Sequence, residues 1–231
     1  MRGRRADRHP GGQEPEGVDH RHRCFRRVAA RGRQGRAGGW HRQRDAGQAD
    51  IFHAPFAPGS FDHVFLCFVL EHLAEPVAAL RALKDLLKPG GTITVVEGDH
   101  GSAYFYPNSD HARQALLCQV ELQARAAGNA LIGRALYPLL VEAGFGAVRV
   151  SPRMVYVDAS KPDLVEGFTR KTFTAMIEGI RTPALQSGLM GAAEFDKGIA
   201  DLCRTTEANG VFCYTFFKAT AVKISRADQE A

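Results

Sequence analysis

From Ile51 onward, the chain alternates short apolar runs with longer segments whose apolar residues recur at helical spacing. Residues 61–68 form an apolar run of the length of a buried strand, and residues 92–97 form a second, β-rich run. Between them, Pro76 can begin a helix, because its missing N–H costs nothing in the first turn. The order strand, helix, strand predicts a parallel pair joined by a right-handed crossover.

The pattern after the second strand is looser. We expect a polar and aromatic loop over residues 99–110, followed by helices at about 112–126 and 131–143. Gly144 fits the left-handed position that commonly follows the end of a helix. Strands and helices in this alternation predict an α/β layered domain.

The last third of the chain holds two further strand-like stretches with a helical segment between them. Residues 147–150 and 154–157 are expected as strand pieces on either side of Pro152, and residues 211–222 as a long aromatic strand. Residues 161–208 are expected to be helical. We therefore predict a helical insertion at 161–208 and an antiparallel edge pair formed by the last two strands.

The first 49 residues differ from the rest in composition. They contain thirteen Arg and nine Gly but no Leu, Ile or Tyr, so they lack the residues of a buried strand or an amphipathic helix. We expect residues 1–48 to be disordered as translated, residues 49–222 to form the domain, and residues 223–231 to be a C-terminal tail.

The positive charge of the chain is concentrated in the same first segment. The formal net charge is +5, but residues 1–49 carry thirteen Arg against five acids, whereas the remainder carries seventeen basic residues against twenty acids. A basic arm of this kind can bind nucleic-acid phosphates, and this reading stays open as an alternative. The absence of Lys from the arm and the acidic body argue against a nucleic-acid partner.

Cysteines and apolar runs narrow the class of protein further. The five cysteines are odd in number, widely spaced and never arranged as C-x-x-C, so neither a disulfide framework nor a metal site is indicated. The longest apolar run, residues 64–70, is far shorter than the roughly 20 residues of a membrane span, and we find no secretory signal. The expected location is the reducing cytoplasm, with no membrane partner.

A series of motifs occurs in one order along the domain. They are ADIFHAPF at 49–56, GSFDHV at 59–64, VLEHL at 69–73, LLKPGGT at 86–92 and LLVEAGF at 139–145. The series resembles the class I S-adenosylmethionine-dependent methyltransferases that act on small molecules, and the resemblance covers residues 49–222. It implies a doubly wound, Rossmann-like α/β fold with a mostly parallel sheet, whose N-terminal strands are incomplete in this chain.

The resemblance also implies where the cofactor, S-adenosyl-L-methionine, binds. Ligands of such sheets lie across the carboxyl ends of the parallel strands. Asp50 is expected to accept a hydrogen bond from the adenine amino group, with Ile51 beside the ring, while Phe68 and Val69 contact the methionine end. His72 follows the same strand and is a further candidate cofactor contact.

Two of these residues have structural alternatives. Asp50 precedes an apolar residue and could simply cap a turn or a helix. His72 could hydrogen-bond to a neighbouring loop instead of the cofactor. We assign no catalytic residue, because an in-line displacement at a sulfonium mainly requires alignment and exclusion of water.

The methyl acceptor is expected beside the carboxyl end of the next strand. Glu97, Asp99 and His100 lie where a substrate or a general base would be reached. Tyr104 belongs to an aromatic set that could line a substrate pocket. The alternative for the first three residues is a solvated loop, and the alternative for Tyr104 is packing against the domain.

The family's glycine-rich turn and the acidic residue that binds the ribose should precede Asp50 by roughly 20–50 residues, and neither is present. An excess of Arg, Gly and Ala without Leu or Ile is typical of a GC-rich gene translated in the wrong frame. In the +1 frame, permitted codons can yield CGVGAQTAILAAKNPR, with a glycine turn, and then ASITGID, with a terminal acid. We therefore predict that residues 1–48 are an out-of-frame translation.

The combined prediction is an enzyme that transfers a methyl group from S-adenosyl-L-methionine to an unidentified small molecule. One alternative is an inactive methyltransferase-like fragment that serves as an interaction module. The other is a nucleic-acid methyltransferase with a basic N-terminal arm.

Overall fold

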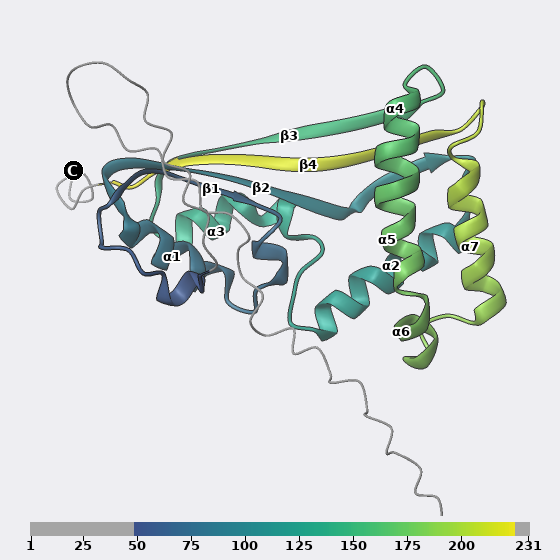
Figure 1. Ribbon diagram of the computed structural model, residues 1–231, viewed down its shortest axis with the longest axis horizontal. Helices are drawn as coiled ribbons and strands as arrows, with labels where there is room; N and C mark the ends of the chain where they lie inside the picture. The colour runs from purple at the N-terminus through teal and green to yellow at the C-terminus, as the bar shows by residue number, and fades with distance from the viewer. Residues whose placement is uncertain (1–48, 225–231) are drawn as a thin grey trace, which may run out of the picture.

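A four-stranded mixed sheet runs the length of the domain in the computed structural model, which describes residues 49–224 (Figure 1). The strand order is β1-β2-β4-β3. Strand β2 pairs with β1 in parallel, and β4 pairs antiparallel with both β2 and β3. The predicted α/β class, the parallel pair and the antiparallel edge pair are confirmed. The strands are β1 (Phe61–Cys67), β2 (Leu87–Tyr106), β3 (Gly146–Asp158) and β4 (Val211–Val222).

Helical segments connect these strands. Before β3 they are η2 (Ile51–His53), η3 (Leu70–His72), α1 (Pro76–Leu86), α2 (Asp110–Arg125), η4 (Ile132–Ala135) and α3 (Leu136–Glu142). Between β3 and β4 they are α4 (Pro162–Leu164), the π-helix η5 (Val165–Thr174), α5 (Ala175–Gly179), α6 (Arg181–Gln186) and α7 (Ala192–Arg204). In Figure 1, α4, η5 and α5 follow one another as a single helical rod.

Local sequence explains where two of these helices begin and end. The hydroxyl of Ser109 caps α2 by accepting a hydrogen bond from the backbone N–H of Ala112 at 3.1 Å. Gly144 follows α3 with a φ of 80°, in the left-handed region that glycine adopts without strain. The N–H of Phe145 then bonds to the carbonyl of Leu140 at 3.1 Å, which completes the helix end predicted from the glycine.

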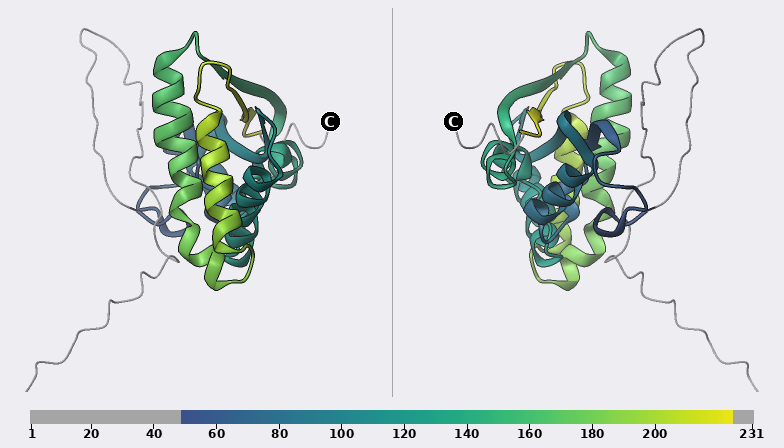
Figure 2. Two further views of the ribbon diagram at one scale, coloured as in Figure 1. Left: turned by 90° about the vertical axis from the view of Figure 1, so that its right-hand side faces the viewer. Right: turned by 90° about the vertical axis from the view of Figure 1, so that its left-hand side faces the viewer.

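Alternate residues of β4 belong to two separate hydrophobic cores. Ala219 and Ala221 pack in a core with α1 and α3, while Phe212 and Tyr214 pack in a second core with α2, η5 and α7. Because successive strand residues point to opposite faces, the two cores cover opposite faces of β4. Figure 1 shows α1 and α3 at one end of the sheet and α5 and α7 at the other, and Figure 2 shows α5 and α7 side by side.

The loop predicted for residues 99–110 is wrong. Strand β2 continues to Tyr106, with its register shifted between Asp99 and Tyr104. Asp99 is opposite Thr215 and Tyr104 is opposite Cys213, so four residues on β2 (100–103) lie between these pairs against one residue, Tyr214, on β4. Small and polar residues in this bulge hide the strand in the sequence, and pairing with the long strand β4 overrides that local signal.

Strand β3 was expected as two pieces but is continuous. It passes through Pro152, which is opposite Phe217 on β4. Proline is tolerated in an edge strand when the position of its missing N–H faces outward. At the opposite end of the sheet, the only pairing that β1 makes within residues 49–224 is with β2, and the side chain of Phe65 on this strand is 58% exposed.

Candidate functional site

The chain turns sharply where β1 ends. Phe68 has a φ of 55°, which is uncommon for a residue with a side chain, and its N–H still bonds to the carbonyl of Val96 on β2 at 2.9 Å. Its ring is partly exposed and lies 5.4 Å from the ring of Phe216 on β4. Phe68 and Val69 therefore sit at the carboxyl ends of the parallel pair, where ligands of α/β sheets bind.

The side chain of Glu97 on β2 contacts this turn. It is fully buried, and its Oε1 accepts hydrogen bonds from the backbone N–H groups of Val69 at 3.0 Å and Leu70 at 2.8 Å. Its Oε2 has no hydrogen-bond partner among the described residues. Burial raises the pKa of Glu97 to about 7, the two N–H groups oppose this rise, and the nearby carboxylate of Glu71 adds to it.

Asp99 is held by an arginine from a neighbouring element. Both nitrogens of the Arg134 guanidinium fork lie 2.7 Å from the Asp99 carboxylate oxygens, and the N–H of Gly101 bonds to the same carboxylate at 3.0 Å. The hydrogen bonds that Arg134 donates to Asp99 raise the pKa of the guanidinium further, so Arg134 stays charged. Gly133 permits this approach, because a Cβ there would lie 2.7 Å from the carbonyl oxygen of Gly98.

His100 forms a buried pair with a tyrosine of β4. Its Nδ1 lies 2.7 Å from the hydroxyl of Tyr214, and its backbone N–H bonds to the carbonyl of Ala130 at 3.0 Å. Burial lowers the pKa of His100, although the carboxylates of Glu71 and Asp99 partly oppose this. Burial also raises the pKa of the Tyr214 hydroxyl. His100 is therefore a neutral, oriented imidazole at neutral pH.

The structure thus brings together three of the residues proposed for the acceptor side. Glu97, Asp99 and His100 are all buried and hydrogen-bonded, so the alternative of a solvated loop is wrong. Tyr104 is not part of this cluster. Its side chain is exposed, and its hydroxyl lies 3.6 Å from the sulfur of Met154 on β3.

The residues predicted near adenine have structural roles as well. The carboxylate of Asp50 caps η2 by accepting a hydrogen bond from the N–H of Phe52 at 2.9 Å, and it lies 2.8 Å from Nδ1 of His53. The capping alternative is therefore present, and an adenine contact for Asp50 stays a prediction. Ile51 is buried in the core that contains Leu80 of α1.

His72 and its neighbour Glu71 differ in burial. The His72 side chain is exposed, with Nε2 3.5 Å from the Glu71 carboxylate. Glu71 is buried, and its backbone carbonyl accepts hydrogen bonds from the N–H of Asn129 at 2.8 Å and from the side chain of Gln123 at 2.9 Å. A cofactor contact for His72 stays a prediction, whereas Glu71 adds a negative charge to the buried cluster.

Two members of the cluster were not predicted as site residues. Arg134 falls inside a helical pattern, and no local signal connects it with an acid 35 positions earlier. Tyr214 belongs to the aromatic strand predicted over residues 211–222 and is buried, but its hydrogen bond to His100 depends on the register between β2 and β4.

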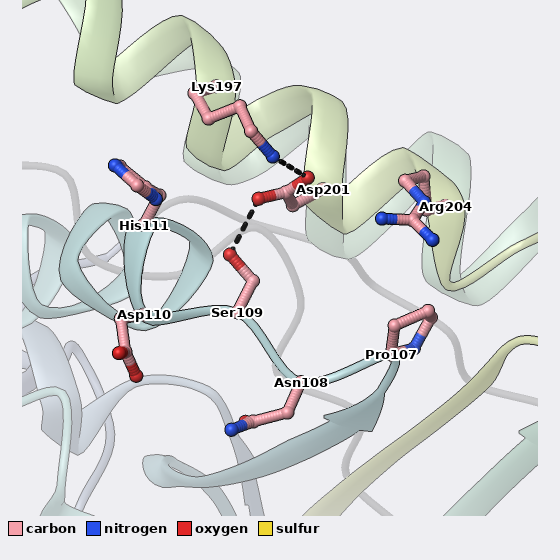
Figure 3. A pocket seen from close by; sticks show the side chains of 8 residues that line it. All are labelled: Pro107, Asn108, Ser109, Asp110, His111, Lys197, Asp201 and Arg204. Carbon is pink, nitrogen blue, oxygen red and sulfur yellow. Dashed lines mark hydrogen bonds and ion pairs between the residues drawn. The ribbon is translucent and has the colours of Figure 1, made fainter.

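A separate pocket of about 340 Å³ lies between the start of α2 and the helix α7. Figure 3 shows Ser109 and Lys197 both pointing at the carboxylate of Asp201. Ser109 donates a hydrogen bond to Asp201 at 2.7 Å, and Lys197 forms an ion pair with it. The buried acid in this pocket is therefore already satisfied by protein groups.

Residues 49–224 contain no group of three or more His, Cys, Asp or Glu side chains that could hold a metal ion. None of the helices described in this part of the chain is long and apolar enough to cross a membrane. The four cysteines within residues 49–224 are free thiols. The predicted out-of-frame segment 1–48, which contains Cys24, and most of the predicted tail lie outside the described residues.

Solved structures with a distant likeness to the chain include methyltransferases. The chain matches a putative methyltransferase from Bacillus halodurans with a TM-score of 0.45 at 14% identity, over 79% of each chain. It matches phosphoethanolamine N-methyltransferase 2 of Haemonchus contortus with a TM-score of 0.40 at 15% identity, over 76% of this chain and 36% of the other.

Sequence relatives and a family model match parts of the chain. It is 35% identical over 140 residues to an uncharacterised transposon protein of Streptomyces fradiae, covering 60% of this chain and 39% of the relative. It is also 35% identical over 100 residues to an uncharacterised methyltransferase of Schizosaccharomyces pombe, covering 43% of this chain and 36% of the relative. The chain thus spans less than two fifths of either relative. Residues 22–95 match the methyltransferase domain family, beginning inside the segment predicted to be out of frame, and this match supports the predicted likeness to class I S-adenosylmethionine-dependent methyltransferases.

Proposed function

We propose that the chain binds S-adenosyl-L-methionine across the carboxyl ends of β1 and β2 and transfers its methyl group to a small molecule. The observation that carries this proposal is the meeting of the strained turn at Phe68 with the buried cluster of Glu97, Asp99 and His100 at one edge of the sheet. Strain at a residue with a side chain and buried polar groups both concentrate at functional sites.

The residues present fit a ligand of this kind. The exposed ring of Phe68 at the end of β1 offers an apolar contact for the methionine end of such a ligand, beside the buried polar groups of β2. When bound, the cofactor supplies a methyl group on a sulfonium. Phe68 and Val69 would flank its methionine end, and Asp50 and Ile51 would contact its adenine.

The acceptor side is proposed to lie beside Asp99 and His100. Because the imidazole of His100 is neutral at neutral pH, it can take a proton from an acceptor hydroxyl or amine. Tyr214 holds Nδ1 and so fixes the orientation of the ring, while Arg134 neutralises the charge of Asp99. The cytoplasm is the proposed compartment, and no nucleic-acid partner is proposed.

The inactive fragment is a second candidate, and one observation favours it. Strand β1 makes its only pairing within residues 49–224 with β2, although central strands of α/β sheets pair on both sides. The exposed ring of Phe65 lies on that same strand. A sheet that ends at β1 would hold the carboxyl ends of only two parallel strands for the cofactor.

The melting temperature with and without S-adenosylhomocysteine tests both candidates. A ligand that binds only the folded state raises the melting temperature. At a concentration one hundred times its Kd, such a ligand adds about 2.7 kcal/mol to the free energy of unfolding. We expect a clear rise in a chain whose residues 1–48 are replaced by their +1-frame translation. A chain that shows no rise in either form would contradict the proposed function.

The chain with its given N-terminus separates the two candidates. A rise in melting temperature would favour the active enzyme and contradict the prediction that residues 1–48 are out of frame. No rise in this chain, together with a rise in the +1-frame chain, would favour the inactive fragment. Adenosine at the same concentration is the control for nonspecific stabilisation.

A further inference from the structure

At the end of β1, a side chain on β2 replaces the backbone carbonyls of that strand as the hydrogen-bond acceptor. Phe68 is bonded to the backbone carbonyl of Val96 on β2. The next two N–H groups, those of Val69 and Leu70, both bond to Oε1 of Glu97 instead. The turn that leaves the sheet is therefore tied to β2 by one carboxyl group.

This carboxyl group occupies an energetically costly position. Glu97 is fully buried, and a buried acid is tolerated when hydrogen bonds satisfy it. The two N–H groups satisfy Oε1, but Oε2 has no partner among the described residues. An apolar side chain could fill the same volume at less cost, so the acid needs an explanation beyond packing.

The turn itself is strained. A residue with a side chain in the left-handed region persists only where its surroundings hold it there, at a cost on the order of 1–3 kcal/mol. Phe68 has this conformation directly before the two N–H groups that Glu97 binds. Without that acceptor, the chain after Phe68 can relax toward an ordinary conformation and carry Val69 with it.

We propose that Glu97 is a positioning residue for the methyl donor, which holds the N–H groups of Val69 and Leu70 and so fixes Phe68 and Val69 where the methionine end of the donor binds. The inference rests on the proposed function for the identity of the ligand. Glu97 acts through the backbone of the turn and is not itself a catalytic residue.

The protonation state of Glu97 should change how firmly the turn at Phe68 is kept closed. An ionised Glu97 regains hydration when the turn opens, whereas a protonated one gains little, so the closed turn is favoured below a pH of about 7 and weakened above it. Oε1 can accept the two hydrogen bonds in either form. The titratable groups that face Glu97 from its surroundings are Cys67, Glu71 and Tyr214, with Asp99 and His100 on its own strand.

Three variants separate positioning from general stability. Glu97→Gln keeps an oxygen acceptor but cannot ionise, and Glu97→Leu removes the acceptor at similar volume. Asp201→Asn is the matched control, because Asp201 is also a buried acid with two protein partners but lies in the pocket between α2 and α7. Circular dichroism of each full-length variant establishes that it folds.

The affinity for S-adenosylhomocysteine is measured by calorimetry at about pH 6 and about pH 8. We expect the original chain and Asp201→Asn to bind severalfold more weakly at the higher pH. Glu97→Gln should bind equally at both, with the affinity that the original chain has at the lower pH. Glu97→Leu should bind S-adenosylhomocysteine about tenfold more weakly than Glu97→Gln does at both pH values. Glu97→Gln following the same pH dependence as the original chain would overturn the proposal.

Amide hydrogen exchange at Val69 and Leu70 gives a readout that needs no ligand. We expect exchange about tenfold faster in Glu97→Leu and unchanged in Glu97→Gln. Unchanged exchange in Glu97→Leu would overturn the role of Glu97 in holding the turn, whatever the binding results. Absence of S-adenosylhomocysteine binding to the original chain and to its +1-frame form, with faster exchange in Glu97→Leu, would instead contradict the proposed function.

Discussion

The guanidinium of Arg134 and the carboxylate of Asp99 form two parallel hydrogen bonds of 2.7 Å. The carboxylate is almost fully buried, whereas the arginine side chain is about half exposed. The pair joins η4 to β2 at the residue where the bulge of the strand begins. Arg134, 35 positions later in the sequence, therefore stabilises the buried carboxylate of Asp99.

Replacing Arg134 with Ala should destabilise the protein by about 2 kcal/mol, because Asp99 would be left buried without its charged partner. Arg134→Lys should recover part of the loss, since lysine keeps the charge but lacks the planar fork. Urea unfolding measures both. In Arg134→Ala with Asp99→Asn the loss should be smaller than the sum of the single losses, and simple additivity would show that the pair is not coupled.

The stability of the folded protein should fall as the pH rises from about 4.5 to about 7, by up to about 3 kcal/mol from Glu97 alone. The sign follows because the folded state raises the pKa of Glu97, so the folded state binds more protons than the unfolded state across this window. Stability curves of the original chain and Glu97→Gln should converge at the acid end and separate toward pH 7, with the variant more stable. Parallel curves would contradict the raised pKa.

Gly98→Ala should destabilise the protein by about 1–3 kcal/mol, because a Cβ at this position would lie 2.4 Å from the Tyr214 hydroxyl. Adding Tyr214→Phe removes the nearest atom, so the double variant should lose less than the two single variants together. Thermal unfolding measures each. Gly179→Ala is the control, since nothing lies within 4 Å of its Cβ position and a helical glycine costs up to about 1 kcal/mol relative to alanine.

Phe65→Lys should reduce self-association of the chain without changing its melting temperature appreciably. The ring is mostly exposed on β1, so little burial is lost, and a lysine on an edge strand opposes pairing with another chain. Light scattering at increasing protein concentration measures the effect, with Phe65→Leu as the apolar control. Equal scattering from the lysine and leucine variants would show that this strand does not mediate association.

Local patterns predicted the elements whose signals are contained in a few neighbouring residues. The apolar run of β1, the proline at the start of α1 and the glycine after α3 each specify their element almost alone. The continuation of β2 to Tyr106 could not be predicted in this way, because it depends on pairing with β4 more than a hundred positions later.

The candidate site was predictable to a similar degree. The position of Glu97, Asp99 and His100 at the carboxyl end of the strand predicted over residues 92–97 identified them, since ligands of α/β sheets bind there. Their partners were not visible. The bond from Leu70 to Glu97 requires the parallel register of β1 and β2, and the bond from His100 to Tyr214 requires the register of β2 and β4.

Pro152 makes the β3 edge of the sheet less able than the β1 edge to pair with another strand. It interrupts the outward row of donors on β3, and Arg149 and Arg153 on the same strand would repel their counterparts in an approaching copy. Strand β1 has no proline, and the one exposed charge on it is Asp62, which forms an ion pair with Lys88. If two copies joined through β1, both β3 edges would face outward, and Pro152 with the two arginines would oppose the addition of further strands to the joined sheet.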